Sequence, residues 1–550
     1  MNTLAHIRSS LLAYIEKNLA VPQELLTHVD ITLNVDAQKQ QFGDMSTNVA
    51  LMLSKELHTN PRALAQRIID NFSHEAIEKY EIAGPGFINI FLRPTVFCQI
   101  AQELYTQHQD FFKLDTSTQP KKYSLEFVSA NPTGPLHLGH GRGGIIGDVL
   151  GNILSFLGHS VTKEFYINDA GSQIQKLGLC LKIRIQQALG IPAELPEDGY
   201  KGEYLITLAQ ECIAQHGNAV LTNTDSFFAN YAKEHLLAQL QETLKNYGII
   251  FDVWFSEKSL HTSGAIEHAL EILNRNGHIY EKDNAVWFKS TDFGDDKDRV
   301  LKKNTGELTY VAADVAYLEN KLDRGFDHLI MILGQDHHSY VVRLKAVLQG
   351  LGKNPHLLDI ILYQLVTLKE SGQILRMSKR AGRSVDLEDV INTVGKDVAR
   401  FFYLNKKADA HLEFDIDLAL KQTDENPVYY IQYAYVRIRS ILEKSAQESL
   451  LQDITAADSA FITASEAILL KKIASLATLL ITISKNYQTH ALTYYVIELA
   501  QAFHSYYGSH RVIDMQHVNQ SRGRLFVISL VRDTLKTCFD LLGISAPERM

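Results

Sequence analysis

The loop 131–141, NPTGPLHLGHG, contains the residues of this chain that are best suited to chemistry. It follows an apolar segment, KYSLEFVSA, and leads into an apolar helical pattern, so its last residues are expected to start a helix. The first N–H groups of a helix have no intrahelical partners and carry the positive end of the helix dipole, which makes them a site for anions. His137 and His140 add ring donors at the same place. The loop therefore predicts a phosphate site.

The helix after this loop is rich in glycine. It contains Gly139, Gly141, Gly143, Gly144, Gly147 and Gly151. Each glycine inside a helix costs about 0.8–1 kcal/mol relative to alanine, so we expect another group to press against this backbone. Three of them spell G-x-G-x-x-G, and Glu164 follows as in a dinucleotide fingerprint. In that fingerprint the first glycine follows the strand directly, whereas a Pro- and Gly-bearing loop intervenes here, so an oxidoreductase is disfavoured.

A second motif, RMSKR at 376–380, places Lys379 between Arg376 and Arg380. A basic loop of this kind is suited to neutralising charge that develops on a triphosphate. Most basic loops are only solvated surface, so the motif gains its meaning from the HLGH motif about 240 residues upstream in the same α/β pattern.

HLGH and MSKR together resemble the two signatures of class I aminoacyl-tRNA synthetases. Further segments resemble the arginyl-tRNA synthetase family: EFVSANPTGPLHLGHGRGG, LTYVAADVAYLENKLDRG, LGQDHHSY, NPVYYIQYAYVRIRS and the final APERM. The resemblance runs from FGDMSTNVAL near position 42 to the last residue. One departure is that Arg376 and Arg380 replace the first lysine and the last serine of the family's K-M-S-K-S loop. Lys121 or Lys122 is therefore a candidate to assist that loop.

The resemblance implies an ATP site, with Mg²⁺ entering as part of the substrate complex and no metal held tightly by the protein. It assigns catalytic roles to His137, His140 and Lys379. The ATP-binding residues that it implies are His137, Gly139, His140, Gly141, Met377 and Lys379.

Recognition of arginine follows from both chemistry and resemblance. A guanidinium is planar, always charged and has five donors, so its pocket requires carboxylates placed for forked hydrogen bonds. Tyr310 and Asp314 are four residues apart and share one face of a predicted helix, although such a pair is more commonly a simple polar edge. By resemblance they form the arginine side-chain site. The other arginine-binding residues implied are Ser129, Asn131, Glu257 and Gln335.

The C-terminal region combines aromatic and basic residues on helices. Aromatic rings that stack on splayed bases and arginines that contact phosphates are how proteins bind single-stranded RNA loops. Taken alone, the pattern is more typical of the core and solvated face of a helical bundle. By resemblance it is the anticodon-binding bundle, with Tyr429, Tyr433 and Arg437 as tRNA-binding residues and with Tyr506 and Tyr507 further along the chain.

These residues require a multidomain α/β protein with a Rossmann-like parallel-sheet catalytic domain. We predict an N-terminal additional α+β domain over 1–115, which the resemblance implies contacts the tRNA elbow, and a catalytic domain over 120–390 with an insertion at about 190–245. A connecting segment at 391–425 then leads to an all-α helical bundle at 426–550. The segments FDVWFS, AVWFKS, HLIMILG and IILYQLVTL are expected as strands of the parallel sheet, and a helix is expected to open at Ser46 or Thr47.

The composition of the chain excludes several classes of protein. The chain has 550 residues, 45% of them hydrophobic and 21% charged, which excludes wholesale disorder. Its net charge of −9 argues against indiscriminate polyanion binding, although local basic patches remain possible. Four cysteines without a C-x-x-C pair fit a reducing compartment, and there is no unbroken run of about 18 apolar residues. We expect a cytoplasmic monomer that has no contact with membranes.

The sequence thus predicts an enzyme that activates L-arginine with ATP, releases pyrophosphate and transfers arginine to the 3′-terminal adenosine of its tRNA. Its partners would be arginine, ATP and the arginine tRNA. Two alternatives stay open at this level: a class I-type nucleotidyltransferase acting on a small metabolite, and a catalytically silent tRNA-binding paralogue.

Overall fold

The computed structural model describes residues 2–26, 29–36, 41–114, 119–375 and 386–550. The chain divides into two compact units. Residues 120–421 and 487–490 form the first, which we call the central unit. The second, the terminal unit, combines residues 1–119 with 422–486 and 491–550.

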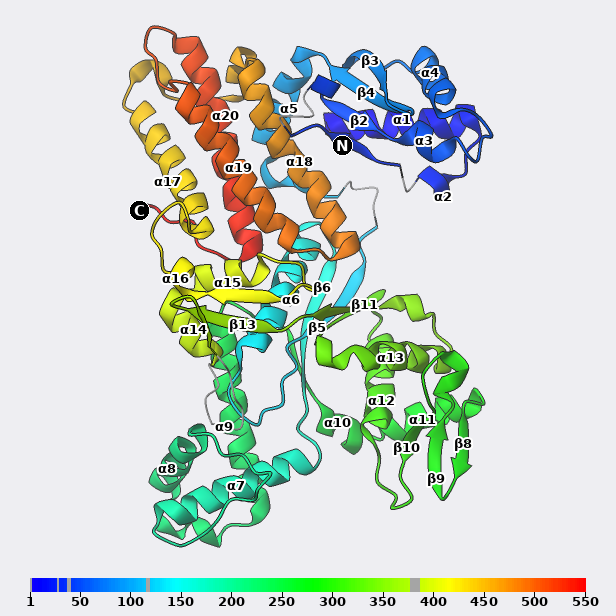
Figure 1. The fold of residues 1–550 in the computed structure, drawn as a ribbon, viewed down its shortest axis with the longest axis vertical. Coiled ribbons are helices and arrows are strands. Elements are labelled where there is room, and N and C mark those ends of the chain that lie inside the picture. Colours follow the sequence, from blue (N-terminus) through cyan, green and yellow to red (C-terminus); the bar gives the residue numbers. More distant parts are fainter. Residues whose placement is uncertain (1, 27–28, 37–40, 115–118, 376–385) are drawn as a thin grey trace. The chain divides into compact units, whose positions relative to one another are not determined.

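A five-stranded, all-parallel sheet organises the central unit (Figure 1). Its strands are β5 (Lys122–Phe127), β6 (Ser160–Ile167), β7 (Val253–Ser256), β11 (His328–Gly334) and β12 (Leu358–Tyr363), in the order β12-β11-β5-β6-β7. After β5 the chain builds outwards through β6 and β7, and it later returns to the other side of β5 with β11. The order therefore reverses between β5 and β11, where open α/β sheets bind ligands at the carboxyl ends of their strands. The predicted Rossmann-like sheet is confirmed.

Two strand assignments were wrong. Residues 285–288 form β9 (Ala285–Phe288), which pairs antiparallel with β8 (Ile279–Lys282) and β10 (Arg299–Lys302) in a separate sheet. The run IILYQLVTL breaks after Tyr363, because its second half is β13 (Val366–Glu370), which pairs with β14 (Gln373–Leu375) and β15 (Leu412–Asp415). Apolar composition reveals that a segment is a strand, but it does not reveal which sheet the strand joins.

Helix α6 (Leu138–Phe156) connects β5 to β6, and its glycines permit very close packing. A Cβ atom added at Gly147 would lie 2.3 Å from the ring of Phe127, and one at Gly143 would lie 2.6 Å from the ring of Tyr363. A Cβ at Gly141 would lie 2.6 Å from the side chain of Leu387. The groups that press on this helix are therefore side chains of the central unit itself.

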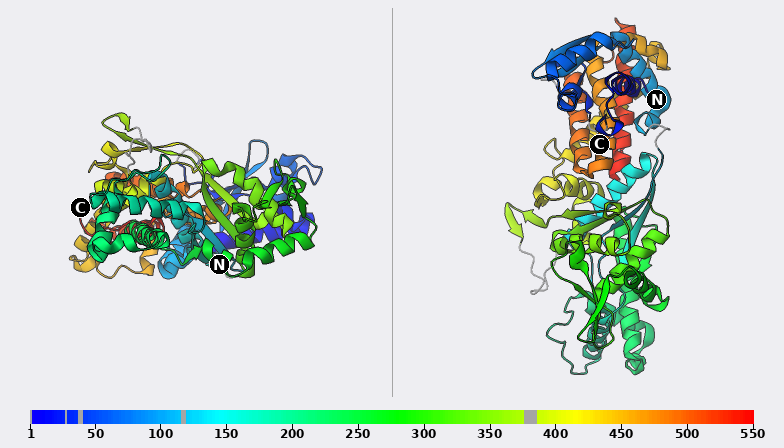
Figure 2. Two further views of the ribbon diagram at one scale, coloured as in Figure 1. Left: turned by 90° about the horizontal axis from the view of Figure 1, so that it is seen from below. Right: turned by 90° about the vertical axis from the view of Figure 1, so that its right-hand side faces the viewer.

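Helices complete the central unit on either side of the sheet. A helical module, α7 (Ser172–Ala188), α8 (Tyr204–His216) and α9 (Asp225–Asn246), shares one apolar core and projects as one end of the unit (Figure 2). Because α7 belongs to that core, the module begins before the predicted insertion at about 190. The others are α10 (Glu257–Thr262), α11 (Ala265–Arg275), α12 (Tyr310–Asp323), α13 (His338–Gly350), α14 (Leu387–Val394), α15 (Lys396–Leu404) and α16 (Ile416–Ala419).

The N-terminal part of the terminal unit is an α+β fold. A four-stranded antiparallel sheet has the order β1-β2-β4-β3, with β1 (Ile31–Leu33), β2 (Met45–Thr47), β3 (Ile77–Ala83) and β4 (Phe87–Leu92). It is accompanied by α1 (Thr3–Leu19), α2 (Gln23–Leu26), α3 (Val49–Leu53), α4 (Pro61–Asn71) and α5 (Pro94–Gln107). The helix expected at Ser46 or Thr47 starts later, at Val49, because Met45–Thr47 pairs with Ile88–Ile90 as a strand.

The C-terminal part of this unit is helical, as predicted. Helices α17 (Pro427–Ser445), α18 (Ala464–Asn486), α19 (His490–Ser509) and α20 (Val518–Leu542) form a bundle, in which α18 to α20 run side by side in Figures 1 and 2. By length and composition α18 is apolar enough to cross a membrane, and 56% of its apolar window is buried in the structure, as in a core helix.

Candidate active site

A cavity of about 370 Å³ opens at the carboxyl edge of the parallel sheet, where the strand order reverses. Several strands deliver residues to it directly from their ends. Ser129 and Asn131 follow β5, Asn168 follows β6, and Glu257 follows β7. Tyr363, the last residue of β12, contributes from the other side. The cavity thus occupies the position in which open α/β sheets hold their ligands.

Most of the predicted site residues that the structure describes meet in this cavity. Its lining includes Ser129, Asn131, His137, His140, Glu257, Tyr310 and Asp314. Gly139, Gly141 and Gln335 are not part of the lining, although each adjoins a residue that is. Met377 and Lys379 lie outside the described residues, as do Arg376 and Arg380.

The two histidines form the N-terminal cap of α6. Their rings stack with centroids 3.6 Å apart. His137 Nδ1 accepts a hydrogen bond from Gly139 N at 3.1 Å, and His140 Nδ1 accepts one from His137 N at 3.2 Å. An Nδ1 atom that accepts is unprotonated, so the proton of each neutral ring resides on Nε2. The cap thereby orients two Nε2–H donors beside the positive end of the helix dipole, which suits an anionic ligand.

Two of the cavity's carboxyl groups have a raised pKa. Burial raises the pKa of Asp314 to about 7, against the lowering effect of Arg343 and with further increases from Glu257 and Glu126. Its Oδ2 atom is buried without a hydrogen-bond partner. Burial also raises the pKa of Glu257, against the lowering effects of Tyr166 and of His261, whose Nε2 lies 3.7 Å from Glu257 Oε1. Such carboxyl groups favour the entry of a cation that can donate hydrogen bonds.

Helix α12 presents Tyr310 and Asp314 to the cavity on one face, as their spacing predicted. Tyr310 is the first residue of the helix and is half exposed, whereas Asp314, one turn further in, is partly exposed and has its Oδ2 atom buried. The opposite face packs into the core through Ala312, Val315 and Ala316. The arrangement places a ring at the mouth of the cavity and a carboxylate at its floor.

The loop after β5 is held in an unusual backbone conformation. Val128 and Ser129 both have positive φ angles, 67° and 40°, which non-glycine residues rarely adopt. Ser129 Oγ donates to Glu126 Oε1 at 3.1 Å and accepts from Tyr166 N at 3.1 Å. Residues held in this way cluster at ligand sites, where the surrounding structure must compensate for the strain.

Several lining residues were missed by sequence reasoning. They are Glu126, Tyr166, Asp336, His337, Tyr340 and Tyr363. Asp336 and His337 directly follow the predicted Gln335, so proximity in sequence offered a signal for them. Glu126 and Tyr166 lie within strands, where a side chain's direction depends on a register that the sequence does not reveal.

The terminal unit carries a second candidate surface, a groove of about 930 Å³ that includes Tyr433, Arg437, Tyr507 and Arg511. The Arg437 guanidinium lies 4.5 Å from the ring centroid of Tyr433 and 5.2 Å from that of Tyr507. Tyr429 stacks parallel to Tyr433, with centroids 6.2 Å apart. The predicted trio is therefore assembled beside this groove.

Tyr506 does not belong to this surface, because it is buried and its hydroxyl donates to Glu466.

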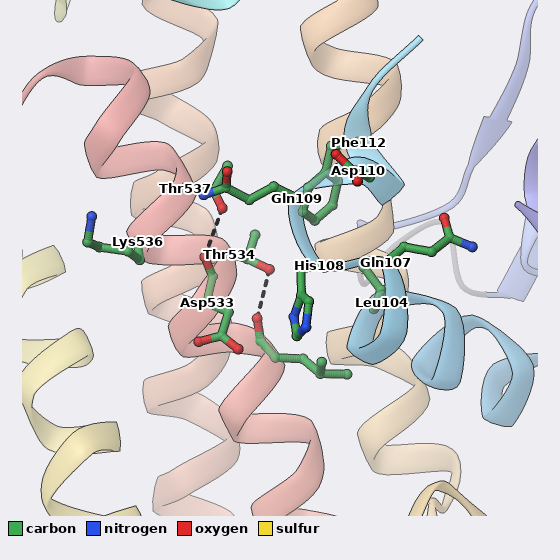
Figure 3. Close-up of a pocket in the computed structure, with 11 residues that line it drawn as sticks. Leu104, Gln107, His108, Gln109, Asp110, Phe112, Asp533, Thr534, Lys536 and Thr537 are labelled. Atoms are coloured by element: carbon green, nitrogen blue, oxygen red, sulfur yellow. Dashed lines mark hydrogen bonds between the residues drawn. The ribbon is translucent and has the colours of Figure 1, made fainter. Parts of the chain in front are cut away.

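A further cavity of about 460 Å³ in the terminal unit lies between α5 and α20 (Figure 3). Two hydroxyls on its α20 wall already donate within the helix, Thr534 to the Leu530 carbonyl and Thr537 to the Asp533 carbonyl. Unlike the cavity of the central unit, it is not lined by any of the buried, unpaired polar atoms found among the described residues. The described residues also contain no cluster of three or more metal-ligating side chains.

Three family models match successive parts of the chain. Residues 5–92 match the arginyl tRNA synthetase N terminal domain, residues 100–415 the class I (R) tRNA synthetase catalytic domain, and residues 431–550 the DALR anticodon binding domain. The arginine–tRNA ligase of Caldanaerobacter subterraneus is 43% identical over 94% of this chain and 93% of its own length. This chain belongs to the arginine–tRNA ligase family.

Other arginine–tRNA ligases support the same conclusion. That of Bacillus subtilis is 41% identical over 92% of both chains. A solved Campylobacter jejuni chain is 34% identical, covers 84% of this chain and all of its own, and superposes with a TM-score of 0.76. The Thermus thermophilus arginyl-tRNA synthetase shares the fold over the full length of both chains, with a TM-score of 0.76 at 20% identity. The chain is therefore an aminoacyl-tRNA ligase whose substrates are arginine, ATP and tRNA.

Proposed function

We propose that the cavity of the central unit is the arginine and ATP site of this ligase. The observation that supports this most directly is Asp314, a residue of the cavity lining whose Oδ2 atom is buried without a hydrogen-bond partner. A guanidinium would supply both the missing charge and the missing donors. In this assignment Asp314, Glu257 and Tyr310 bind the arginine side chain. Asn131 holds its α-amino and carboxylate groups, with Ser129 nearby, and Gln335 belongs to the same pocket.

ATP is proposed to bind at the start of α6. The Nε2–H donors of His137 and His140 would contact the phosphates, with Gly139 and Gly141 allowing the backbone to approach. The loop that contains Met377 and Lys379 would neutralise the charge of the leaving pyrophosphate. Mg²⁺ would enter with ATP, held mainly by phosphate oxygens. Whether Lys121 or Lys122 assists this loop stays a prediction.

The proposed reaction has two steps. The arginine carboxylate attacks the α-phosphorus of ATP, forming arginyl-adenylate and releasing pyrophosphate, and a hydroxyl of the tRNA's 3′-terminal adenosine then takes the arginyl group. Positioning and charge stabilisation suffice for both steps, so no covalent enzyme intermediate is required. Tyr429, Tyr433 and Arg437 are proposed to bind the anticodon loop, and residues 1–115 the tRNA elbow. We further propose that the enzyme acts as a cytoplasmic monomer.

An ATP–pyrophosphate exchange assay against the twenty amino acids, with and without total tRNA, tests this proposal. Exchange that depends on arginine and arginine tRNA is expected. Exchange with a non-amino-acid metabolite would favour a related nucleotidyltransferase, and tRNA binding without exchange would favour a silent paralogue. The residue assignment is tested separately by Tyr310→Ala, which should weaken arginine binding without changing the KM for ATP.

A further inference from the structure

Lys321 is fully buried, which is unusual for a lysine. It continues the face of α12 that carries the cavity residues, because Tyr310, Asp314, Tyr317 and Lys321 follow one another at intervals of four, three and four positions. The first three line the cavity, whereas Lys321 lies beneath its wall.

The Lys321 ammonium is shared between two buried carboxylates. Its Nζ lies 2.7 Å from Glu126 Oε2 and 3.5 Å from Glu164 Oε1. Glu164 has a second cation in Arg324, which contacts both of its oxygens. For Glu126, Lys321 is the only cation within ion-pairing distance among the described residues. The two carboxylates therefore depend on Lys321 to different degrees.

Glu126 connects this lysine to the cavity. It lines the cavity wall, and its other oxygen, Oε1, accepts the hydrogen bond from Ser129 Oγ. Ser129 is one of the two residues held at positive φ, and Asn131 follows two positions later. A continuous chain of contacts thus runs from Lys321 through Glu126 to the loop that shapes the amino acid side of the site.

We propose that Lys321 is a positioning residue for arginine recognition. Its ammonium group pairs with Glu126 Oε2 and aligns the carboxylate, so that Glu126 Oε1 accepts from Ser129 Oγ and fixes the loop that receives the substrate. This inference rests on the proposed assignment of the cavity as the arginine site. Without Lys321, Glu126 would be a buried, uncompensated charge that a proton neutralises. The protonated group would disturb the loop and remove negative charge from the cavity.

Lys321→Met tests the inference in the full-length enzyme. At pH 7 we expect the KM for arginine to rise at least about tenfold, while the KM for ATP stays unchanged and kcat stays within about threefold of wild type. The reason is that the substitution removes an interaction that supports substrate binding, and not one that forms only in the transition state. The variant's defect in kcat/KM should shrink at least about threefold between pH 7 and pH 9, as Glu126 loses its added proton. Tyr317, Tyr166 and Asp314 also lie close enough to Glu126 to interact with it, and Glu164 shares Lys321 with it.

Arg324→Met is the matched control, because it removes a cation from Glu164 but none from Glu126. We expect it to change the KM for arginine less than about twofold. An equal rise in both variants, or a Lys321→Met defect that does not depend on pH, would overturn the positioning role and leave a general effect of the buried ion pairs.

A double variant keeps the test valid if Lys321→Met does not fold. Glu126→Gln combined with Lys321→Met removes both charges, and replacing a buried ion pair by neutral groups is often tolerated. If Lys321 acts through Glu126, the double variant will have the same KM for arginine as Glu126→Gln alone. A further multiplicative loss would contradict the inference. Failure of the proposed arginine site itself would appear differently, as normal arginine kinetics in Asp314→Ala.

Discussion

Asp314 and Glu257 are short of positive charge before any substrate arrives. Burial disfavours their charged forms, as the raised pKa of each shows, and the Asp314 Oδ2 atom has no hydrogen-bond partner. A guanidinium can satisfy two separated carboxylates at once because its donors form a planar fork, whereas the compact ammonium of lysine cannot. A ligand that leaves either carboxyl group without a hydrogen-bond partner binds more weakly, and this difference in affinity gives selectivity for arginine.

Asp314 predicts a pH dependence of arginine use. Its pKa in the folded, unliganded enzyme is about 7, so below pH 7 the carboxyl group is mostly protonated and binds a guanidinium poorly. We expect kcat/KM for arginine to rise as the pH increases through about 7, and arginine binding below that pH to release a proton. Rates measured from pH 5.5 to 9 at saturating ATP would show this rise. A profile that is flat across pH 6–8 would place the titration elsewhere.

Replacing Asp314 should separate arginine binding from ATP binding. Asp314→Ala leaves a buried guanidinium without its partner, and such losses are on the order of 3–5 kcal/mol. The KM for arginine should therefore rise at least about 100-fold, with the KM for ATP little changed. Asp323→Ala, at the exposed end of the same helix, is the matched control and should behave as wild type. An unchanged KM for arginine in Asp314→Ala would remove this residue from the pocket.

At the scale of the element, α6 and α12 position the site in different ways. Helix α6 approaches the sheet closely because its glycines leave room for Phe127 and Tyr363. Helix α12 instead delivers a stripe of polar residues along one face while its other face joins the core. The first helix supplies an N-terminus of fixed location, and the second supplies side chains.

Gly147→Ala should destabilise the protein even though alanine favours helices. The new Cβ would lie 2.3 Å from the Phe127 ring, and overpacking of this kind typically costs about 1–3 kcal/mol, more than the ~1 kcal/mol gained in helix propensity. Gly508→Ala is the matched control, because no atom lies within 4 Å of its added Cβ and its φ is not positive. Thermal unfolding should show a lower transition for Gly147→Ala and an unchanged or higher one for Gly508→Ala. Equal transitions would contradict the packing argument.

The sequence was informative where spacing determines direction. Residues His137 and His140 at a helix start, and Tyr310 and Asp314 on one helix face, lie where their patterns predicted, since helical periodicity fixes which side chains share a face. It was uninformative where partners are distant in the chain. The assignment of β9 and β13 to other sheets, and the meeting of Glu126 with Lys321, depend on tertiary pairing that no local pattern encodes.

At the scale of the whole molecule, the candidate chemistry lies in the central unit and the candidate anticodon surface in the terminal unit. Each belongs to a separate part of the chain, so a substitution in one unit should affect one substrate class selectively. Because the net charge of the chain is −9, binding of a polyanion depends on local positive charge. Arg437, Lys444 and Arg511 form such a local cluster.

Arg437→Ala should weaken tRNA use without weakening arginine use. We expect the KM for tRNA to rise about tenfold or more, and the slope of log affinity against log salt to fall by about 1 if the guanidinium contacts a phosphate. Arg532→Ala, whose arginine pairs with Asp533 on α20, is the control and should leave both quantities unchanged. Aminoacylation between 50 and 200 mM salt measures both. If Arg437→Ala alters the KM for arginine alone, the groove is not the tRNA surface.

The terminal unit is assembled from both ends of the chain, and this has a consequence for its synthesis. Asp44 pairs with Lys471 at 3.1 Å, and the ring of Tyr105 packs 5.3 Å from that of Phe526. Asp44 and Tyr105 leave the ribosome first. Residues 120–421 must then be synthesised before the C-terminal helices that carry Lys471 and Phe526. At about 5–20 residues per second, this interval is on the order of 15–60 s. During it, α5 can pack against α1 but not against α18 or α20, so the N-terminal part of the terminal unit completes its packing only after the C-terminal helices have been made.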